Sequence, residues 1–163
     1  MQEAENNMRN IREVRKADLD RIREIVSTGL RKCVLESEEH FDFLYTEICN
    51  ILDNLSEDKD SSLFWVIEQN NFILGVISIQ KYWKISTMFI DPEYHRSGIG
   101  RELLTQAIDY CKGRSPKGCL MLNSSNHAAP FYRKMGFTQT GNPRDLPGGC
   151  IPFEYQYKNE IYG

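Results

Sequence analysis

The chain has 163 residues, a formal net charge of −3 and 40% hydrophobic residues. This length fits a single domain over residues 1–163, and we predict its core at about residues 10–158. A slightly acidic chain is not typical of a nucleic-acid-binding protein, which is usually clearly basic. No apolar run is long enough to span a bilayer, and the first ten residues lack a secretory apolar segment. We therefore predict a cytoplasmic protein with no membrane partner.

The five cysteines are widely spaced, and none forms a C-x-x-C pair: Cys33, Cys49, Cys111, Cys119 and Cys150. This pattern favours buried free thiols in a reducing compartment over a disulfide framework. The three histidines are scattered, without the paired spacing of metal ligands. We predict no metal site.

The first half of the chain predicts a strand, two helices and a hairpin. The strand is expected at residues 10–15, and Asp18 is a candidate N-cap for the first helix. A second helix is expected at about residues 38–55, with Ser37 as its cap. Strands at residues 63–68 and 72–80 follow, joined by a polar turn. The apolar stripe of the first helix is Leu19, Ile22, Ile25, Val26 and Leu30.

The second half predicts a strand, helix, strand and helix, then two last strands. A strand at residues 85–90 ends at Asp91-Pro92, and a helix begins at the Gly98-Ile99-Gly100 turn. A right-handed crossover would place the next strand, at 118–123, parallel to the first. A short helix at 128–135 and strands at 137–140 and 151–157 complete a mixed α/β (α+β) fold. We expect a mostly antiparallel sheet of six to seven strands with a parallel central pair, flanked by about four helices.

The turn at Gly98 has the properties of an anion site. The first N–H groups of a helix lack internal partners, and the helix dipole adds partial positive charge there. Glycine lets a phosphate approach the backbone closely. An ordinary strand–turn–helix joint explains the same glycines. A dinucleotide-binding turn is not favoured, because Leu103 stands where its third glycine belongs.

This stretch resembles the pyrophosphate-binding segment of the GNAT superfamily of acyl-CoA N-acyltransferases. That motif is [QR]-x-x-G-x-[GA] after a strand and a D/H-P-x-[YH] turn. Asp91-Pro92-Glu93-Tyr94 and Gly98-Ile99-Gly100 match it, whereas His95 stands where the family has Gln or Arg. The departure removes one usual side-chain contact with the cofactor.

A second stretch, NSSNHAAPFYRKMGF at residues 123–137, resembles the family's N-x-x-A-x-x-x-Y-x-k-x-G-F segment. Ser125 stands where many members carry Asn. The resemblance covers about residues 10–158, and it implies a GNAT fold, acetyl-CoA as cofactor and the following cofactor-binding residues. The backbone of Met88, Phe89 and Ile90 would hold the acyl and pantetheine portions. His95, Arg96, Ser97, Gly98, Ile99, Gly100 and Arg101 would surround the pyrophosphate. Asn123 and Ser125 in the second segment would also contact the cofactor.

The resemblance makes Tyr132 the general acid that returns a proton to the departing thiolate; in isolation a tyrosine at this spacing more often only packs. The general base is not readable from the sequence. Candidates of low specificity are Lys84, Glu36, Glu39 and Glu68. His127 could touch substrate, although a loop histidine is more often only solvated.

Residues 36–60 contain nine acidic residues. They could attract a cationic amine, but a solvated acidic face is the simpler interpretation. Four aromatic residues, Phe41, Tyr45, Tyr82 and Trp83, could line an acceptor pocket or only pack.

The resulting prediction is a single N-acetyltransferase domain. It would transfer acetyl from acetyl-CoA to a primary amine of an unidentified small molecule or peptide, by direct attack in a ternary complex. A non-catalytic acyl-CoA-binding module on the same fold is the alternative, and His95 is the residue that favours it. We expect a monomer or a homodimer.

Overall fold

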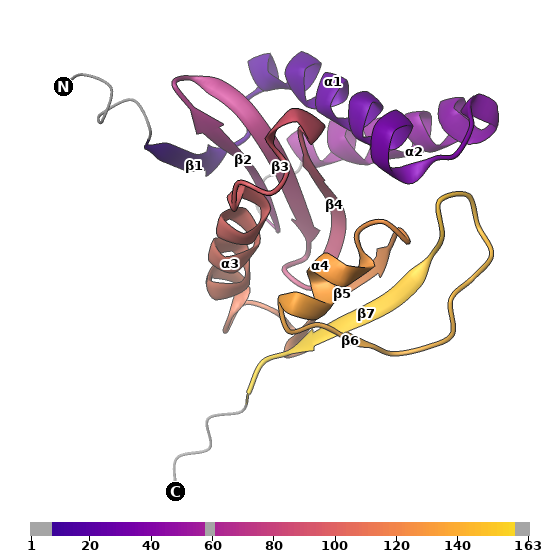
Figure 1. Cartoon of the computed structure of the whole chain (residues 1–163). Coiled ribbons are helices and arrows are strands. Elements are labelled where there is room, and N and C mark those ends of the chain that lie inside the picture. Colours follow the sequence, from indigo (N-terminus) through magenta and orange to yellow (C-terminus); the bar gives the residue numbers. More distant parts are fainter. Residues whose placement is uncertain (1–7, 58–60, 159–163) are drawn as a thin grey trace, which may run out of the picture.

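A computed structural model describes residues 8–57 and 61–158 (Figure 1). Its seven-stranded sheet has the order β1-β2-β3-β4-β5-β7-β6, antiparallel except for the β4–β5 pair. The strands are β1 (Arg9–Glu13), β2 (Ser62–Gln69), β3 (Phe72–Gln80), β4 (Lys84–Ile90), β5 (Cys119–Ser124), β6 (Thr138–Gln139) and β7 (Ile151–Gln156). The helices are α1 (Leu19–Gly29), α2 (Phe41–Glu57), α3 (Ile99–Cys111) and α4 (Ala129–Lys134). The predicted element order and the parallel central pair are confirmed.

Helices cover both faces of the sheet, with α1 and α2 on one side and α3 on the other (Figure 1). Neighbouring residues on β3 serve opposite faces: Val76 packs in the cluster under α1 and α2, and Ile77 packs in the cluster under α3. Each fully buried aliphatic side chain of this kind contributes roughly 1.5–3 kcal/mol. The apolar stripe predicted for the first helix is buried, so helical periodicity correctly identified the face of α1. In α3, Ile99, Leu103, Leu104, Ala107, Ile108 and Cys111 are buried in the same way.

Asp18 occupies the N-cap position of α1, but the prediction that its side chain caps the helix was wrong. Its carboxylate instead accepts two hydrogen bonds from Arg12 and one from the backbone N–H of Arg15. Gly29 does not end the helical path, which continues as a π-helical turn, η3 (Leu30–Val34). Gly29 is needed for space instead: a Cβ there would lie 2.7 Å from the Phe89 ring on β4. Ser37 does act as a cap, accepting from the N–H of Glu39 at the start of η4 (Glu38–His40).

The sheet opens between its two parallel strands. Among the described residues, Lys84 and Met121 form the single register pair between β4 and β5, beside a hydrogen bond from the Met121 N–H to the Trp83 carbonyl at 2.8 Å. A register shift opposite Ser78 and Ile79 bends β4 just after this point. Beyond Lys84 the two strands separate, and the opening between them positions the site. Within the described ranges, none of the helices is both long and apolar enough to cross a bilayer.

Candidate active site

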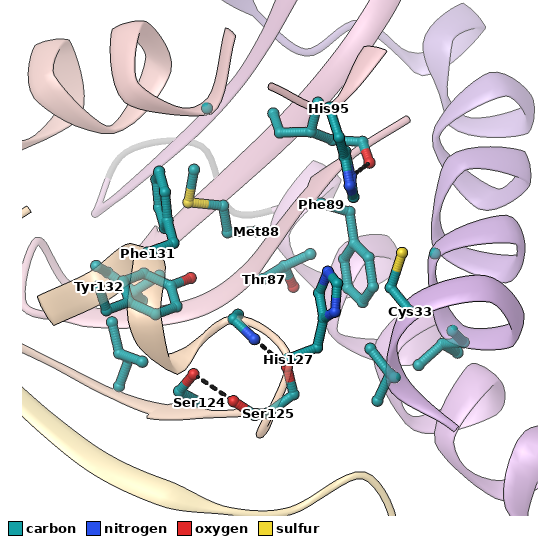
Figure 2. Close-up of a pocket in the computed structure, with 18 of the residues that line it drawn as sticks. Cys33, Thr87, Met88, Phe89, His95, Ser124, Ser125, His127, Phe131 and Tyr132 are labelled. Carbon is teal, nitrogen blue, oxygen red and sulfur yellow. Dashed lines mark hydrogen bonds between the residues drawn. The ribbon is translucent and has the colours of Figure 1, made fainter. Parts of the chain in front are cut away.

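A cavity of about 790 Å³ fills the opening between β4 and β5. Its walls come from β4, the loop into α3, the end of β5, α4 and the α1–α2 side (Figure 2). Twelve of the thirteen residues predicted to bind cofactor or catalyse line it: Met88, Phe89, Ile90, His95, Arg96, Gly98, Ile99, Gly100, Arg101, Asn123, Ser125 and Tyr132. Ser97 is absent from the wall, and its hydroxyl donates to the Tyr94 carbonyl instead.

The loop before α3 has the backbone shape of an anion-binding turn. Arg96 and Gly98 have φ values of 66° and 82°, in the left-handed region. The N–H of Glu102 donates to the Gly98 carbonyl at 3.0 Å, so the N–H groups of residues 99–101 precede the helix's own hydrogen bonds. Nothing lies within 4 Å of the position a Gly98 Cβ would take. Gly98 is therefore required by its φ, and the space beside it is open to a ligand.

Two arginines hold this loop in place. Arg21 on α1 donates to the Asp91 carboxylate at 2.7 Å, and the other Asp91 oxygen accepts from the N–H of Glu93 at 3.0 Å. Arg9 on β1 donates to the Ser97 carbonyl at 2.9 Å and pairs with Glu102 at 2.9 Å. These bonds hold the turn in position beside the cavity, which its residues 98–101 line.

Tyr132 on α4 is buried, 6% exposed, with its hydroxyl pointing into the cavity toward Thr87 (Figure 2). Its ring packs edge-on against Phe131 and Phe137. Burial raises the pKa of Tyr132 above its usual value near 10, so the hydroxyl stays protonated at neutral pH. The geometry presents a fixed proton donor in an apolar setting.

Thr87 on β4 is a site residue that the sequence motifs did not indicate. Its side chain is 3% exposed, lines the cavity, and its hydroxyl has no hydrogen-bond partner among the described residues. A buried unpaired hydroxyl costs about 1–3 kcal/mol, so a group that supplies its bond is favoured there. The alternation of side chains along the strand could have placed Thr87 on this face of the sheet. It could not have shown that the Thr87 hydroxyl lacks a hydrogen-bond partner.

In the loop between β5 and α4, the serine side chains form hydrogen bonds with the backbone of the same loop. Ser125 Oγ accepts from the N–H of Ala128 at 3.2 Å, and Ser124 Oγ donates to the Ser125 carbonyl at 2.8 Å. Both residues still line the cavity. Ser125 thus shapes the start of α4, and Asn123 is the exposed polar side chain at the end of β5.

The charges on the cavity wall are of one sign. Arg96, Arg101 and Lys134 line it, whereas no Asp or Glu of the described residues does. The base candidates Lys84, Glu36, Glu39 and Glu68 lie outside the wall. Glu68 instead pairs with Arg12 at 3.2 Å. The acidic residues in the described part of 36–60 do not line the cavity either, and neither do Phe41, Tyr45, Tyr82 and Trp83.

The α1–α2 side of the cavity is mostly apolar. It is formed by Leu30, Val34, Leu44 and Ile48, together with Cys33. Sequence reasoning placed no cysteine near the site, because Cys33 lies far from both motifs. Burial raises the pKa of the Cys33 thiol, an effect that the charge of Lys32 partly opposes, so the reactive thiolate is disfavoured.

Comparison with known proteins first defines the class of fold. PaiA N-acetyltransferase from Thermoplasma acidophilum, solved with coenzyme A, superposes with a TM-score of 0.75 at 22% identity, covering 92% of this chain and 99% of that one. YncA of Salmonella typhimurium, described as a putative acetyltransferase and solved with acetyl-CoA, gives a TM-score of 0.66 at 19% identity, covering 96% and 98%. At these identities the likeness establishes the fold.

The family follows from the sequence match. Residues 34–155 match the model of the acetyltransferase (GNAT) domain. The chain therefore belongs to the GNAT acetyltransferase family.

Two curated relatives share shorter segments with this chain. Glucosamine 6-phosphate N-acetyltransferase of Trypanosoma brucei brucei is 38% identical over 55 residues, 32% of this chain and 35% of the relative. Peptidyl-lysine N-acetyltransferase YiaC of Escherichia coli is 34% identical over 74 residues, 45% and 48% respectively. The chain thus spans between about a third and a half of the length of these relatives.

Proposed function

We propose that this protein is an N-acetyltransferase that moves the acetyl group of acetyl-CoA to an amine by direct attack in a ternary complex. One observation carries the proposal: the opening between β4 and β5 contains both the anion-binding turn before α3 and the Tyr132 hydroxyl. A thioester bound with its diphosphate at the turn reaches into the same cavity as the proton donor.

The N–H groups at the start of α3 would hold the coenzyme A diphosphate, with Arg96 and Arg101 as cationic neighbours. The pantetheine arm would run along residues 88–90, whose β5-facing edge has no register partner in the described chain. Main-chain groups left free at a strand edge are ready to pair with the arm's amides. Thr87, the unpaired buried hydroxyl, is placed to bond the pantetheine or thioester.

In the reaction, the amine nitrogen bonds to the thioester carbon, and the carbon–sulfur bond then breaks. The departing thiolate takes the proton of the Tyr132 hydroxyl, which burial keeps in place until that moment. The attacking nitrogen gives its own proton to solvent water, and water returns one proton to the Tyr132 oxygen. The products are an amide, free coenzyme A and the regenerated tyrosine. No carboxylate base is assigned, because none of the described acidic residues lines the cavity.

The wall composition also supports an acceptor class. A wall of Leu30, Val34, Leu44 and Ile48 favours an amine carried on an apolar body, since burying such a body removes apolar surface from water. It gives a polyamine no carboxylate to pair with. The names of the relatives, a phosphosugar and a peptidyl-lysine enzyme, do not decide the acceptor, because their matches span less than half of each relative.

The test is a thiol-release assay with acetyl-CoA and paired acceptors, phenethylamine against spermidine. We expect the kcat/KM for phenethylamine to be at least about tenfold higher, a difference of about 1.4 kcal/mol. Tyr132→Phe should lower kcat by roughly 100-fold or more while leaving coenzyme A affinity within about twofold, because general acid catalysis contributes 10²–10⁴-fold. Phe131→Leu, a change in the neighbouring ring, is the control for packing.

The same assay separates the non-catalytic alternative. A pure binding module would bind coenzyme A but release no thiol above background with any amine. Full turnover in Tyr132→Phe would remove Tyr132 from the mechanism without touching the cofactor site. Preference for spermidine would overturn the apolar acceptor alone.

A further inference from the structure

Three potential ligand side chains from distant parts of the chain meet at one place on the cavity wall. Cys33 comes from the π-helical turn η3, His95 from the loop after β4, and His127 from the loop between β5 and α4. Each offers one atom, the cysteine Sγ or an imidazole nitrogen, and these atoms all lie within 4.8 Å of one another (Figure 2). We infer that Cys33, His95 and His127 form a binding site for a thiophilic divalent cation of the Zn²⁺ class.

The spacing is close to what such an ion needs. With Zn–S of about 2.3 Å and Zn–N of about 2.0–2.1 Å, tetrahedral ligand atoms lie about 3.3–3.7 Å apart. To bring ligand atoms that lie up to 4.8 Å apart to this spacing, the side chains must move by about 1 Å. Two of them are exposed histidines on loops, where such movements are easily made. The rings of His95 and His127 already lie 30° from parallel with their centroids 6.2 Å apart. The three groups therefore need no rebuilding of the fold to converge.

The donor set selects the class of ion. One sulfur and two imidazole nitrogens suit Zn²⁺ and its softer neighbours, whereas Mg²⁺ and Ca²⁺ require oxygen ligands. No Asp or Glu of the described residues lines this cavity, so oxygen-rich coordination is not available there. Three protein ligands leave a fourth position open, and because all three residues line the cavity, that position faces it.

One of the two histidines is held at the wall by a hydrogen bond independent of a metal. His95 Nε2 hydrogen-bonds with the Ile90 carbonyl at 2.9 Å, which fixes the ring beside the end of β4. An ion would either take this nitrogen in exchange for the carbonyl or bind Nδ1 with that bond kept, the arrangement that metal-ligating histidines commonly show. His127 follows the loop that Ser124 and Ser125 brace. A bound ion would connect η3, the β4 loop and the β5 loop across the mouth of the opening.

The chain supplies matched controls, because it contains three histidines and five cysteines. His40 lies in η4, exposed, 4.0 Å from the Glu39 carboxylate. Cys150 is a half-buried free thiol outside the cavity wall. His40→Ala and Cys150→Ser therefore remove one imidazole and one thiol of the same kinds without touching the site.

The experiment is a titration of the reduced, metal-free protein with Co²⁺ and then with Zn²⁺, without acetyl-CoA. We expect one Co²⁺ per chain, with a thiolate-to-cobalt charge-transfer band and visible bands of tetrahedral intensity, both abolished by a molar equivalent of Zn²⁺. Cys33→Ser should lose the charge-transfer band, and His127→Ala should bind Zn²⁺ more than about tenfold more weakly, the loss that even outer partners of a metal site cause. His40→Ala, Cys150→Ser and Tyr132→Phe should bind as the parent does.

Absence of the charge-transfer band in the parent protein, or its persistence in Cys33→Ser, would overturn the site. Equal Zn²⁺ affinity in His127→Ala and His40→Ala would do the same. Circular dichroism of each variant checks that the fold is kept. Since the titration uses neither acetyl-CoA nor turnover, its failure leaves the transferase proposal standing, and a failed thiol-release assay leaves the metal site standing.

Discussion

The guanidinium of Arg21, on the helix that covers one face of the sheet, lies 2.7 Å from the carboxylate of Asp91, at the turn leading to α3. The two side chains are 17% and 11% exposed. Arg21 also donates to the Ile73 carbonyl at 3.1 Å, and its guanidinium lies 4.2 Å from the Phe72 ring centroid. The Arg21 guanidinium thus joins α1 to β3 and to the turn that precedes the anion-binding loop.

Asp91→Asn should destabilise the protein by about 2–3 kcal/mol, because it removes the buried carboxylate partner of Arg21 and leaves only the exposed Glu24 carboxylate, 3.0 Å away, to pair with a largely buried guanidinium. Coenzyme A affinity should fall as well, since the turn loses its fixed position. Urea denaturation and calorimetric titration measure the two effects. The control is Asp20→Asn, which removes a fully exposed carboxylate 3.3 Å from Arg23 on the same helix. Equal stability in the two variants would show that the Arg21–Asp91 pair does not hold the turn.

Gly98→Ala tests the anion-binding turn. Left-handed φ costs a residue with a Cβ roughly 1–2 kcal/mol, although nothing lies within 4 Å of the added atom. Gly113 has φ of 80° and the same open surroundings at the other end of α3, outside the cavity wall. Gly98→Ala and Gly113→Ala should therefore lose similar stability, while the Gly98 variant alone binds coenzyme A at least about tenfold more weakly. A matching loss of affinity in both would place the diphosphate elsewhere.

The free energy of unfolding at acidic pH should depend on the charge of Asp18. Hydrogen bonds from Arg12 hold the pKa of Asp18 below its usual value, against the opposing effect of burial. A depressed folded-state pKa contributes stability that is complete above the unfolded pKa near 3.9 and is lost as pH falls through the folded value. Asp18→Asn should therefore be less stable than the parent at pH 7, with the gap narrowing below about pH 4.

The pH dependence of the Asp18 variant is read from urea denaturation between pH 2.5 and 7, a range set by the unfolded pKa. Asp145→Asn, a change at an exposed loop carboxylate, is the control and should follow the parent at each pH. A constant gap between parent and Asp18→Asn across the whole range would mean that Asp18 acts through packing and not through its charge.

Gly29→Ala should destabilise the protein, although alanine normally favours a helix by about 1 kcal/mol over glycine. The new Cβ would lie 2.7 Å from Phe89 Cδ1 and 3.2 Å from Cε1, so the ring must move. Because Phe89 lines the cavity, the Gly29→Ala variant should also show a changed KM for the acceptor amine. Adding Phe89→Leu should recover at least half of the lost stability; no recovery in the double variant would contradict a clash at this ring.

Much of this fold was readable from local pattern. The stripe of α3, the turn at Asp91 and the Tyr132 segment depend on residues close in sequence, and each was placed correctly. What sequence reasoning missed depends on tertiary geometry. Asp18 pairs with Arg12 on the neighbouring strand, and the Thr87 hydroxyl finds no partner among the described residues. Cys33 lies 62 residues before His95, and His95 lies 32 residues before His127. No spacing rule covers such a group.

The single register pair between β4 and β5 in the described residues, Lys84 with Met121, also bears on how the two parts of the sheet are held together. Four strands lie on one side of this pair and three on the other, and side chains from both sides pack in one core cluster. We therefore expect the shared core, more than backbone hydrogen bonds between β4 and β5, to set how far the two parts of the sheet can separate.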